Sequence, residues 1–303
     1  MQFLAAYIMK GRLQAMTVAA TLALLSLPFP PTSIVSSAAV ALVTLRRGAG
    51  EGLYVLLCAC VAATVLSLLL GIGYQFPLLY GAVLWTPVWL ISIVLREGRH
   101  LAVAIEIAVL LGVLAVLGFY GYQSQPAQLW SGVLAVMMQP VLEANPDVPA
   151  EQIKQSAQAF AHFMTGAIAA GTVYGLLFGL FLARWWQAAL YNPGGFKAEF
   201  LGLRGHKPLA LASIAVLVTA GLSSGGLAEI CWNLVEVLFV LYTFIGTAVL
   251  HASFAAMKGA RFMVPFLYVT LLLIPHVMIL IALSGLGDTW LDLRKKISNQ
   301  TAA

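Results

Sequence analysis

Six polar residues recur at helical spacing within one apolar stretch of the chain: Glu229, Asn233, Glu236, Thr243, Thr247 and His251. Their spacings of 4, 3, 7, 4 and 4 residues place all six near one face of a single helix. Carboxylates in an apolar segment are costly unless they face a protein interior, a water-filled cavity or a partner. The stripe therefore predicts contact with something polar, and Glu236, about two turns deeper than Glu229, is its best functional candidate.

A further histidine, His276, follows Pro275 in the middle of the last apolar stretch. A proline at this position kinks a helix and frees a carbonyl one turn back. His276 and His251 could join the carboxylates in a proton relay or a ligand site. The alternative is structural, because a buried histidine that bonds a freed carbonyl needs no ligand. The candidate ligand-binding set is therefore Glu236, Asn233, Glu229, His251 and His276.

Signatures of enzymes and metal sites are missing from the sequence. Gly285-Leu-Gly-Asp288 matches the short G-x-G-D string of intramembrane aspartyl proteases, but that chemistry needs a second membrane-embedded aspartate. No H-E-x-x-H, G-x-S-x-G or G-x-x-x-x-G-K motif is present. Cys58 and Cys60 lie two apart in an apolar run, so a helix would point them in different directions. We expect no catalytic residue, no metal and no cofactor.

The elements that position these residues are transmembrane helices. Of 303 residues, 61% are hydrophobic and 9% are charged, against roughly 25% charged in a soluble domain. Period-two alternation is missing, so the spans are helices. We predict an all-α polytopic bundle, one integral membrane domain over 1–303, with about nine spans (eight is the alternative). They cover 13–29, which we interpret as a retained first span, and 32–45, 53–73, 77–95, 101–122, 165–187, 208–224, 226–256 and 263–284.

The distribution of basic residues sets the orientation, because lysine and arginine in short loops resist translocation. With the N-terminus inside, twelve of the 16 basic residues lie on the cytoplasmic side: Lys10, Arg12, Arg46, Arg47, Arg96, Arg99, Arg184, Lys197, Arg204, Lys207, Lys258 and Arg261. Lys154, Arg294, Lys295 and Lys296 are the exceptions, and one span fewer would move the C-terminal tail inside. Loop placement explains the net charge of +5, so we expect a bacterial inner membrane and no nucleic-acid partner. Glu106, near the cytoplasmic end of its span, would reach headgroups or pair with Arg99.

Two loops are long enough to have structure of their own. The external segment 123–164 contains Pro149-Ala-Glu151, typical of a helix start, and a short amphipathic helix should follow. This loop is either a lid over an outward-facing cavity or a packed connector. The cytoplasmic segment 184–207 combines Trp185, Trp186 and Tyr191 with basic residues. It is either a lipid-facing anchor or a docking site for a cytoplasmic partner.

Glycines recur at four-residue spacing in the sixth span, at Gly171, Gly175 and Gly179. They form a smooth groove into which another helix backbone can approach closely. The groove predicts helix packing, either within the chain or against a membrane partner or a second copy.

The segment Arg46-Arg-Gly-Ala-Gly-Glu-Gly52 resembles the R-G-x-x-x-G entry of the S components of energy-coupling-factor transporters. Most of the chain, including 182–196 and the Gly285–Arg294 tail, is similar to the uncharacterised YybS-like bacterial membrane proteins, which are thought to be distant relatives of S components. The resemblance implies a bundle that encloses a small hydrophobic or vitamin-like ligand, with separate ATPases and a coupling protein supplying energy. S components have six spans, and no ligand residue can be transferred by position.

Three functions follow as hypotheses. The first is a small-molecule binding or transport bundle whose eighth span lines the cavity. The second is a scaffold that recruits partners through the glycine face or the cytoplasmic aromatic loop. The third, a membrane enzyme acting on lipid, has only the acid and histidine set to support it.

Overall fold

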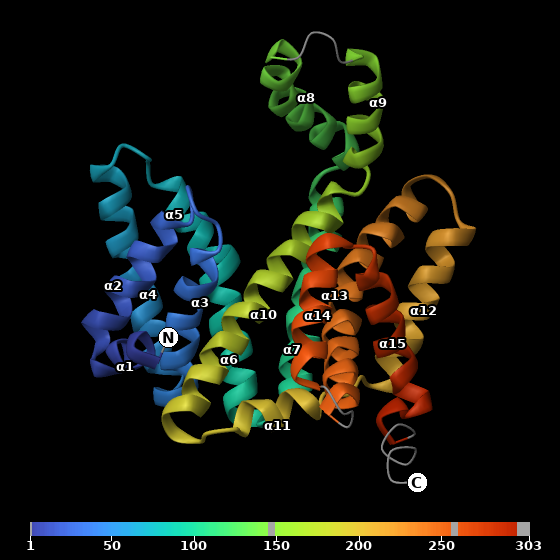
Figure 1. The fold of residues 1–303 in the computed structure, drawn as a ribbon. Helices are drawn as coiled ribbons and strands as arrows, with labels where there is room; N and C mark the ends of the chain where they lie inside the picture. The colour runs from blue at the N-terminus through green and yellow to red at the C-terminus, as the bar shows by residue number, and fades with distance from the viewer. Residues whose placement is uncertain (1, 145–148, 256–259, 296–303) are drawn as a thin grey trace.

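The computed structural model describes residues 2–144, 149–255 and 260–295, and all regular elements in these ranges are helices (Figure 1). In chain order they are α1 (Gln2–Lys10), α2 (Arg12–Leu25), α3 (Thr32–Arg47), α4 (Ala49–Leu69), α5 (Gln75–Tyr80), the π-helical η1 (Gly81–Trp85), α6 (Thr86–Gly98), α7 (Leu101–Tyr122), α8 (Pro126–Ala144), α9 (Ala150–Ala161), α10 (Met164–Tyr191), α11 (Gly195–Leu201), α12 (Lys207–Leu222), α13 (Gly225–Ala255), α14 (Ala260–Leu273) and α15 (Val277–Leu291).

Five helical segments are long and apolar enough to cross a membrane: α4, the continuous α5–η1–α6 segment, α7, α10 and α13. They run from 21 to 31 residues, which corresponds to roughly 31–46 Å at the rise of an α-helix, against about 30 Å of hydrocarbon. The chain is therefore a helical membrane protein, as its composition predicts. Four further apolar helices are shorter, so nine full spans are not established.

The last expected span, 263–284, is wrong as a single helix. α14 ends at Leu273 and α15 begins at Val277, and the turn between them contains Pro275. A proline has no N–H for the helical ladder and clashes with the preceding turn, and here the result is a full break. The N–H groups of Val277 and Met278 instead bond to the carbonyls of Ile274 and Pro275 at 3.0 Å. The chain reverses, so α1 and the end of α15 lie at the same end of the bundle (Figure 1).

That end, which we call the basic end, is cross-linked by arginines from several loops. The Arg12 guanidinium pairs with Glu51 at the start of α4, and Arg47 donates to the Met9 carbonyl at 2.6 Å. Arg294 donates to the carbonyls of Leu201, the last residue of α11, and of Leu203, so the tail lies beside the segment 184–207. Arg294 of the basic tail therefore lies with the other basic loops at this end, whereas the number of spans, nine or eight, is not established. Lys258 and Lys296 are outside the described residues.

The segment 123–164 leaves the bundle at the opposite end, which we call the far end, and forms two helices, α8 and α9 (Figure 1). The predicted helix after Pro149 is confirmed as α9, with Glu151 in its first turn. The 19-residue α8 is not foreseen by the sequence pattern, because it contains Pro140 in its interior.

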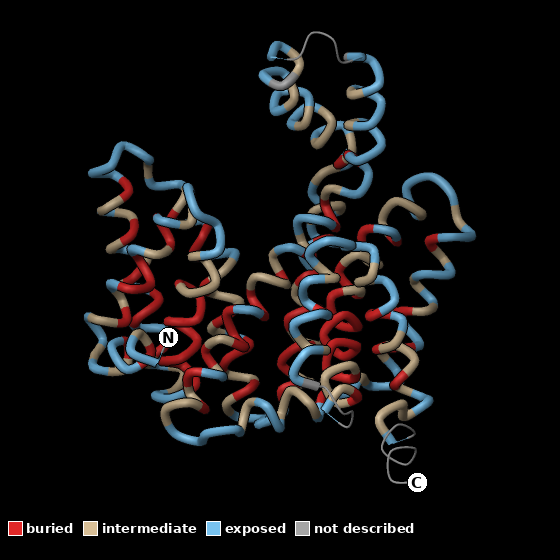
Figure 2. Tube along the Cα trace, viewed as in Figure 1, coloured by how far each residue is buried: buried red, intermediate tan, exposed pale blue. Residues whose placement is uncertain are grey.

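The core is centred on α13. In the most apolar 18-residue stretch of α13, about 67% of the residues are buried, against 33–44% in the other long helices. Figure 2 shows buried residues along α13. Two glycines let α15 approach it: a Cβ at Gly246 would collide with the Ile281 carbonyl, and one at Gly285 with the Tyr242 carbonyl. The backbones therefore touch at this crossing.

The glycines of α10 have different surroundings. Gly179 lies against α3, where a Cβ would stand 2.9 Å from Ser37 Cβ. A Cβ at Gly171 or at Gly175 would meet nothing within 4 Å among the described residues. Packing of these two against a helix of another chain stays a prediction.

Candidate functional site

Three residues of the predicted stripe, Glu229, Asn233 and Glu236, gather at the far end of the bundle. There the first half of α13 meets the end of α7 and the short turn between α9 and α10. The residues opposite the stripe are Tyr120 of α7 and His162 and Gly166 of the α9–α10 junction. We call these six residues the polar cluster. It lies at the base of the α8–α9 hairpin.

Asn233 is fully buried and uses its whole amide. Its Oδ1 accepts a hydrogen bond from the backbone N–H of Gly166 at 2.5 Å. Its Nδ2 lies 2.7 Å from the His162 carbonyl oxygen, 2.8 Å from that of Glu229 and 3.1 Å from Tyr120 Oη. The first N–H groups of a helix have no partner within it, so Asn233 caps α10 from a neighbouring helix.

The Glu229 side chain joins α7 to the α9–α10 junction. Its Oε1 accepts a hydrogen bond from Tyr120 Oη at 2.8 Å, and its Oε2 lies 2.6 Å from His162 Nδ1. The Glu229 side chain is 18% exposed and that of His162 is 56% exposed. Glu229 therefore links the exposed His162 to the half-buried Tyr120.

Glu236 lies one turn beyond Asn233 on α13 and packs against the start of α10. A Cβ at Gly166 would stand 2.5 Å from Glu236 Oε2 and 2.6 Å from the Asn233 backbone, which cannot move aside, so only glycine fits there. Among the described residues, this oxygen is buried without a hydrogen-bond partner. Burial of a carboxylate oxygen without a hydrogen-bond partner costs free energy. Such a group is suited to accept a proton or to bind a polar partner.

Neither of the two candidate histidines bonds a residue of this cluster in the described part of the chain. His251 is 15 residues beyond Glu236, about 22 Å along the helix. Its Nε2 is 3.2 Å from Tyr268 Oη, and its ring packs against Phe200. His276 stands in the turn between α14 and α15, at the opposite end of the bundle from His251. Among the described residues, neither histidine therefore makes a hydrogen bond or ion pair with the carboxylates, and the two histidines lie at opposite ends of the bundle.

One expected neighbour is replaced by another. Glu106 bonds His206, with Nδ1 at 2.7 Å, rather than Arg99. Tyr120 and His162, which complete the polar cluster, were missed by the sequence reasoning. They lie 109 and 67 residues from Glu229, and no local spacing connects residues so far apart.

Thr243 and Thr247 of the stripe bond carbonyls of their own helix.

An apolar cavity of about 460 Å³ lies between η1–α6, α7 and α10, under the first turns of α8. Small residues, among them Ala82, Ala115 and Ala169, leave the space open. At its far end Trp130 of α8 stacks on Phe119 of α7, with ring centroids 5.7 Å apart, and its Nε1 donates to Thr165 Oγ1 at 2.8 Å. The indole of Trp130 thus covers that end of the cavity.

The cavity and the polar stripe lie on different sides of the contact between α7 and α10. Gly112 lines the cavity, and a Cβ there would stand 2.6 Å from Val173 Cγ2 and 2.8 Å from Val237 Cγ1. This close packing separates the cavity from α13. Asn233, Glu236 and His251 line none of the described cavities, so their role as ligand contacts stays a prediction.

In the described ranges, no three His, Cys, Asp or Glu side chains are grouped to hold a metal ion. Comparison of the chain with protein-family models, curated proteins and solved structures finds no match. The resemblance to YybS-like proteins and to S components is therefore supported only by the residues that carry it.

Proposed function

We propose that this protein binds a small apolar molecule in the cavity between η1–α6, α7 and α10, as the binding component of a bacterial inner-membrane transport system. The observation that carries the proposal is the cavity itself. Its volume of about 460 Å³ lies within the roughly 300–1,000 Å³ of small-molecule sites. Its walls come from membrane-spanning helices, so the ligand would enter from the lipid phase or from beneath α8.

The polar groups in the cavity indicate the class of ligand. Thr165 Oγ1 accepts the Trp130 N–H, and Thr172 Oγ1 donates to the Ile168 carbonyl at 2.8 Å. Both hydroxyls are thus engaged by the protein, and the other lining groups are apolar side chains and one glycine. A ligand with many polar groups would lose its hydrogen bonds to water there. The site therefore suits a hydrophobic molecule, the class that the resemblance to S components implies.

A pair of alanines on α10 provides the test. Ala169 lines the cavity, whereas Ala167 is exposed on the same helix. Ala169→Phe should fill the cavity, and Ala167→Phe should leave it open. We expect native mass spectrometry of the purified protein to detect a retained small molecule in the wild type and in Ala167→Phe, and not in Ala169→Phe. Equal retention by both variants would place the ligand elsewhere and refute the assignment.

The alternative function is a scaffold that recruits a membrane partner or a second copy through α10. It is favoured by the open surroundings of Gly171 and Gly175, because small residues on a spanning helix allow close helix contact. Gly175→Leu should then abolish co-purification of a stoichiometric partner, while Ala169→Phe should not.

A further inference from the structure

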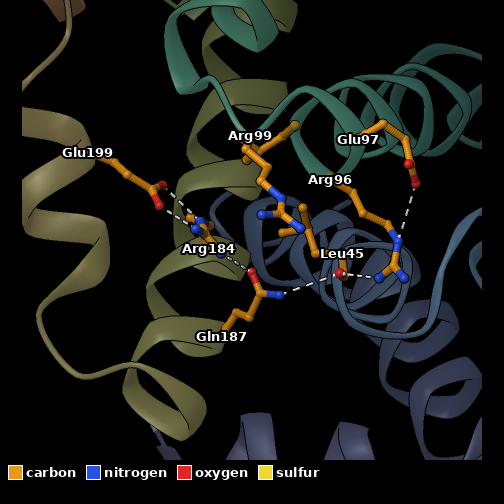
Figure 3. A pocket seen from close by; sticks show the side chains of 8 residues that line it. Leu45, Arg96, Glu97, Arg99, Arg184, Gln187 and Glu199 are labelled. Atoms are coloured by element: carbon orange, nitrogen blue, oxygen red, sulfur yellow. Dashed lines mark hydrogen bonds and ion pairs between the residues drawn. The ribbon is translucent and has the colours of Figure 1, made fainter.

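A second cavity, of about 450 Å³, lies at the basic end, where α3 and α6 finish and α10 approaches α11 (Figure 3). Unlike the apolar cavity, it is lined by charged groups. Three arginines face it, Arg96 and Arg99 from the end of α6 and Arg184 from α10, together with Glu97 and Glu199. Three guanidinium groups against two carboxylates leave one positive charge without a counter-ion.

Two of the arginines are held by the protein. Arg184 pairs with both oxygens of the Glu199 carboxylate and with the Gln187 amide oxygen. Arg96 Nη1 donates to the Leu45 carbonyl at 2.7 Å, and its Nε is 3.4 Å from Glu97 Oε1. These contacts fix two guanidinium groups at the walls of the cavity before any ligand arrives.

Arg99 is different. Its side chain lies between Arg96 and Arg184 in Figure 3, and within the described part of the chain its guanidinium makes no hydrogen bond or ion pair. Its backbone has φ 55°, in the left-handed region that non-glycine residues seldom adopt. The three positive charges that line the cavity repel each other. A bound anion between them would relieve that repulsion.

We infer that this cavity binds a phosphate group, held by Arg99 and by the wall guanidinium of Arg96. Guanidinium forks match the oxygens of a phosphate and bond them in pairs. The carboxylate of Glu199, which would repel an anion, is already covered by Arg184, and that of Glu97 is exposed.

Aromatic and basic residues at the basic end bear on the source of the phosphate. Tyr191, at the end of α10, lies under the Arg46 guanidinium at 4.1 Å from its ring centroid. Aromatic and basic residues of this kind mark the headgroup level. The phosphate can therefore come from an anionic lipid headgroup or from solution, and the experiment separates these sources.

Two substitutions at Arg99 test the site. Arg99→Asn removes the guanidinium and keeps a residue that tolerates positive φ, and Arg99→Gly serves if the asparagine variant folds poorly. Lys197→Gln is the control, because it removes a positive charge from exposed α11 at the same end without touching the cavity. The readout is the shift in the thermal midpoint of detergent-purified protein on titration with phosphatidylglycerol, phosphatidylcholine or inorganic phosphate.

We expect phosphatidylglycerol or inorganic phosphate to stabilise the wild type and Lys197→Gln at similar concentrations. Half-saturation should rise about tenfold in the Arg99 variants, as for loss of one charged hydrogen bond. A response to the lipid alone assigns a headgroup, and a response to inorganic phosphate assigns a soluble anion. The inference is overturned if phosphatidylcholine acts as well as phosphatidylglycerol with no effect of phosphate, or if the Arg99 variants respond like the wild type.

Discussion

The Oδ1 atom of Asn233 in α13 accepts a hydrogen bond from the backbone N–H of Gly166 in α10, at 2.5 Å. This bond joins the central helix of the bundle to the helix that begins beneath the α8–α9 hairpin. Because Asn233 also bonds the His162 carbonyl, one side chain fixes both sides of the junction from which the hairpin projects.

Replacing Asn233 by leucine should destabilise the protein by about 1–3 kcal/mol, because the N–H of Gly166 and the carbonyl of His162 would be buried without a partner. Thermal unfolding in detergent measures the change. Thr247→Val is the matched control on the same helix, since its hydroxyl bonds only a carbonyl one turn back. A loss in Asn233→Leu no larger than in Thr247→Val would contradict the capping role.

Two glycines of α10 should respond in opposite ways to alanine. At Gly166 a Cβ would stand 2.5 Å from Glu236 Oε2 and 2.6 Å from the Asn233 backbone, whereas Gly171 has nothing within 4 Å among the described residues. Gly166→Ala should therefore lower stability, by about 1–3 kcal/mol if the overpacking is typical. Gly171→Ala should be neutral or stabilise by up to about 1 kcal/mol, because alanine favours helix. Equal effects of the two substitutions on the thermal midpoint would show that α10 does not pack as described.

Glu236→Leu should fold and be at least as stable as the wild type. The substitution removes a buried oxygen that has no hydrogen-bond partner among the described residues, and groups kept at such a cost usually serve function. Glu236→Gln, which keeps the shape and removes the charge, should insert normally yet alter function. If Glu236→Leu proved both stable and fully active in transport, the carboxyl would be dispensable. A marked loss of stability would instead show that it has a structural partner.

Much of this arrangement follows from the sequence, because it depends on local patterns. Long apolar stretches predicted the five long spans, and spacing along one helix placed Glu229, Asn233 and Glu236 together. The break at Pro275 was expected only as a kink, since a proline alone does not decide between a bent helix and a reversal. The contacts of Tyr120 and His162 with Glu229 are set by tertiary packing. So is the apolar cavity, which arises where four helical segments leave space between small side chains.

The reversal at Pro275 makes a prediction about topology that a single span over 263–284 does not. With α14 and α15 as a hairpin, the end of α15 lies at the basic end with α1, and α8 lies at the far end. Reporter fusions distinguish the two arrangements, because green fluorescent protein matures in the cytoplasm and alkaline phosphatase is active only after export. A fluorescent fusion at the C-terminus should be bright and the phosphatase fusion there inactive. A fusion after Gln123, which follows α7 at the far end, should give the reverse result and serves as the control. A C-terminal phosphatase as active as the one after Gln123 would restore the odd number of crossings and exclude the hairpin.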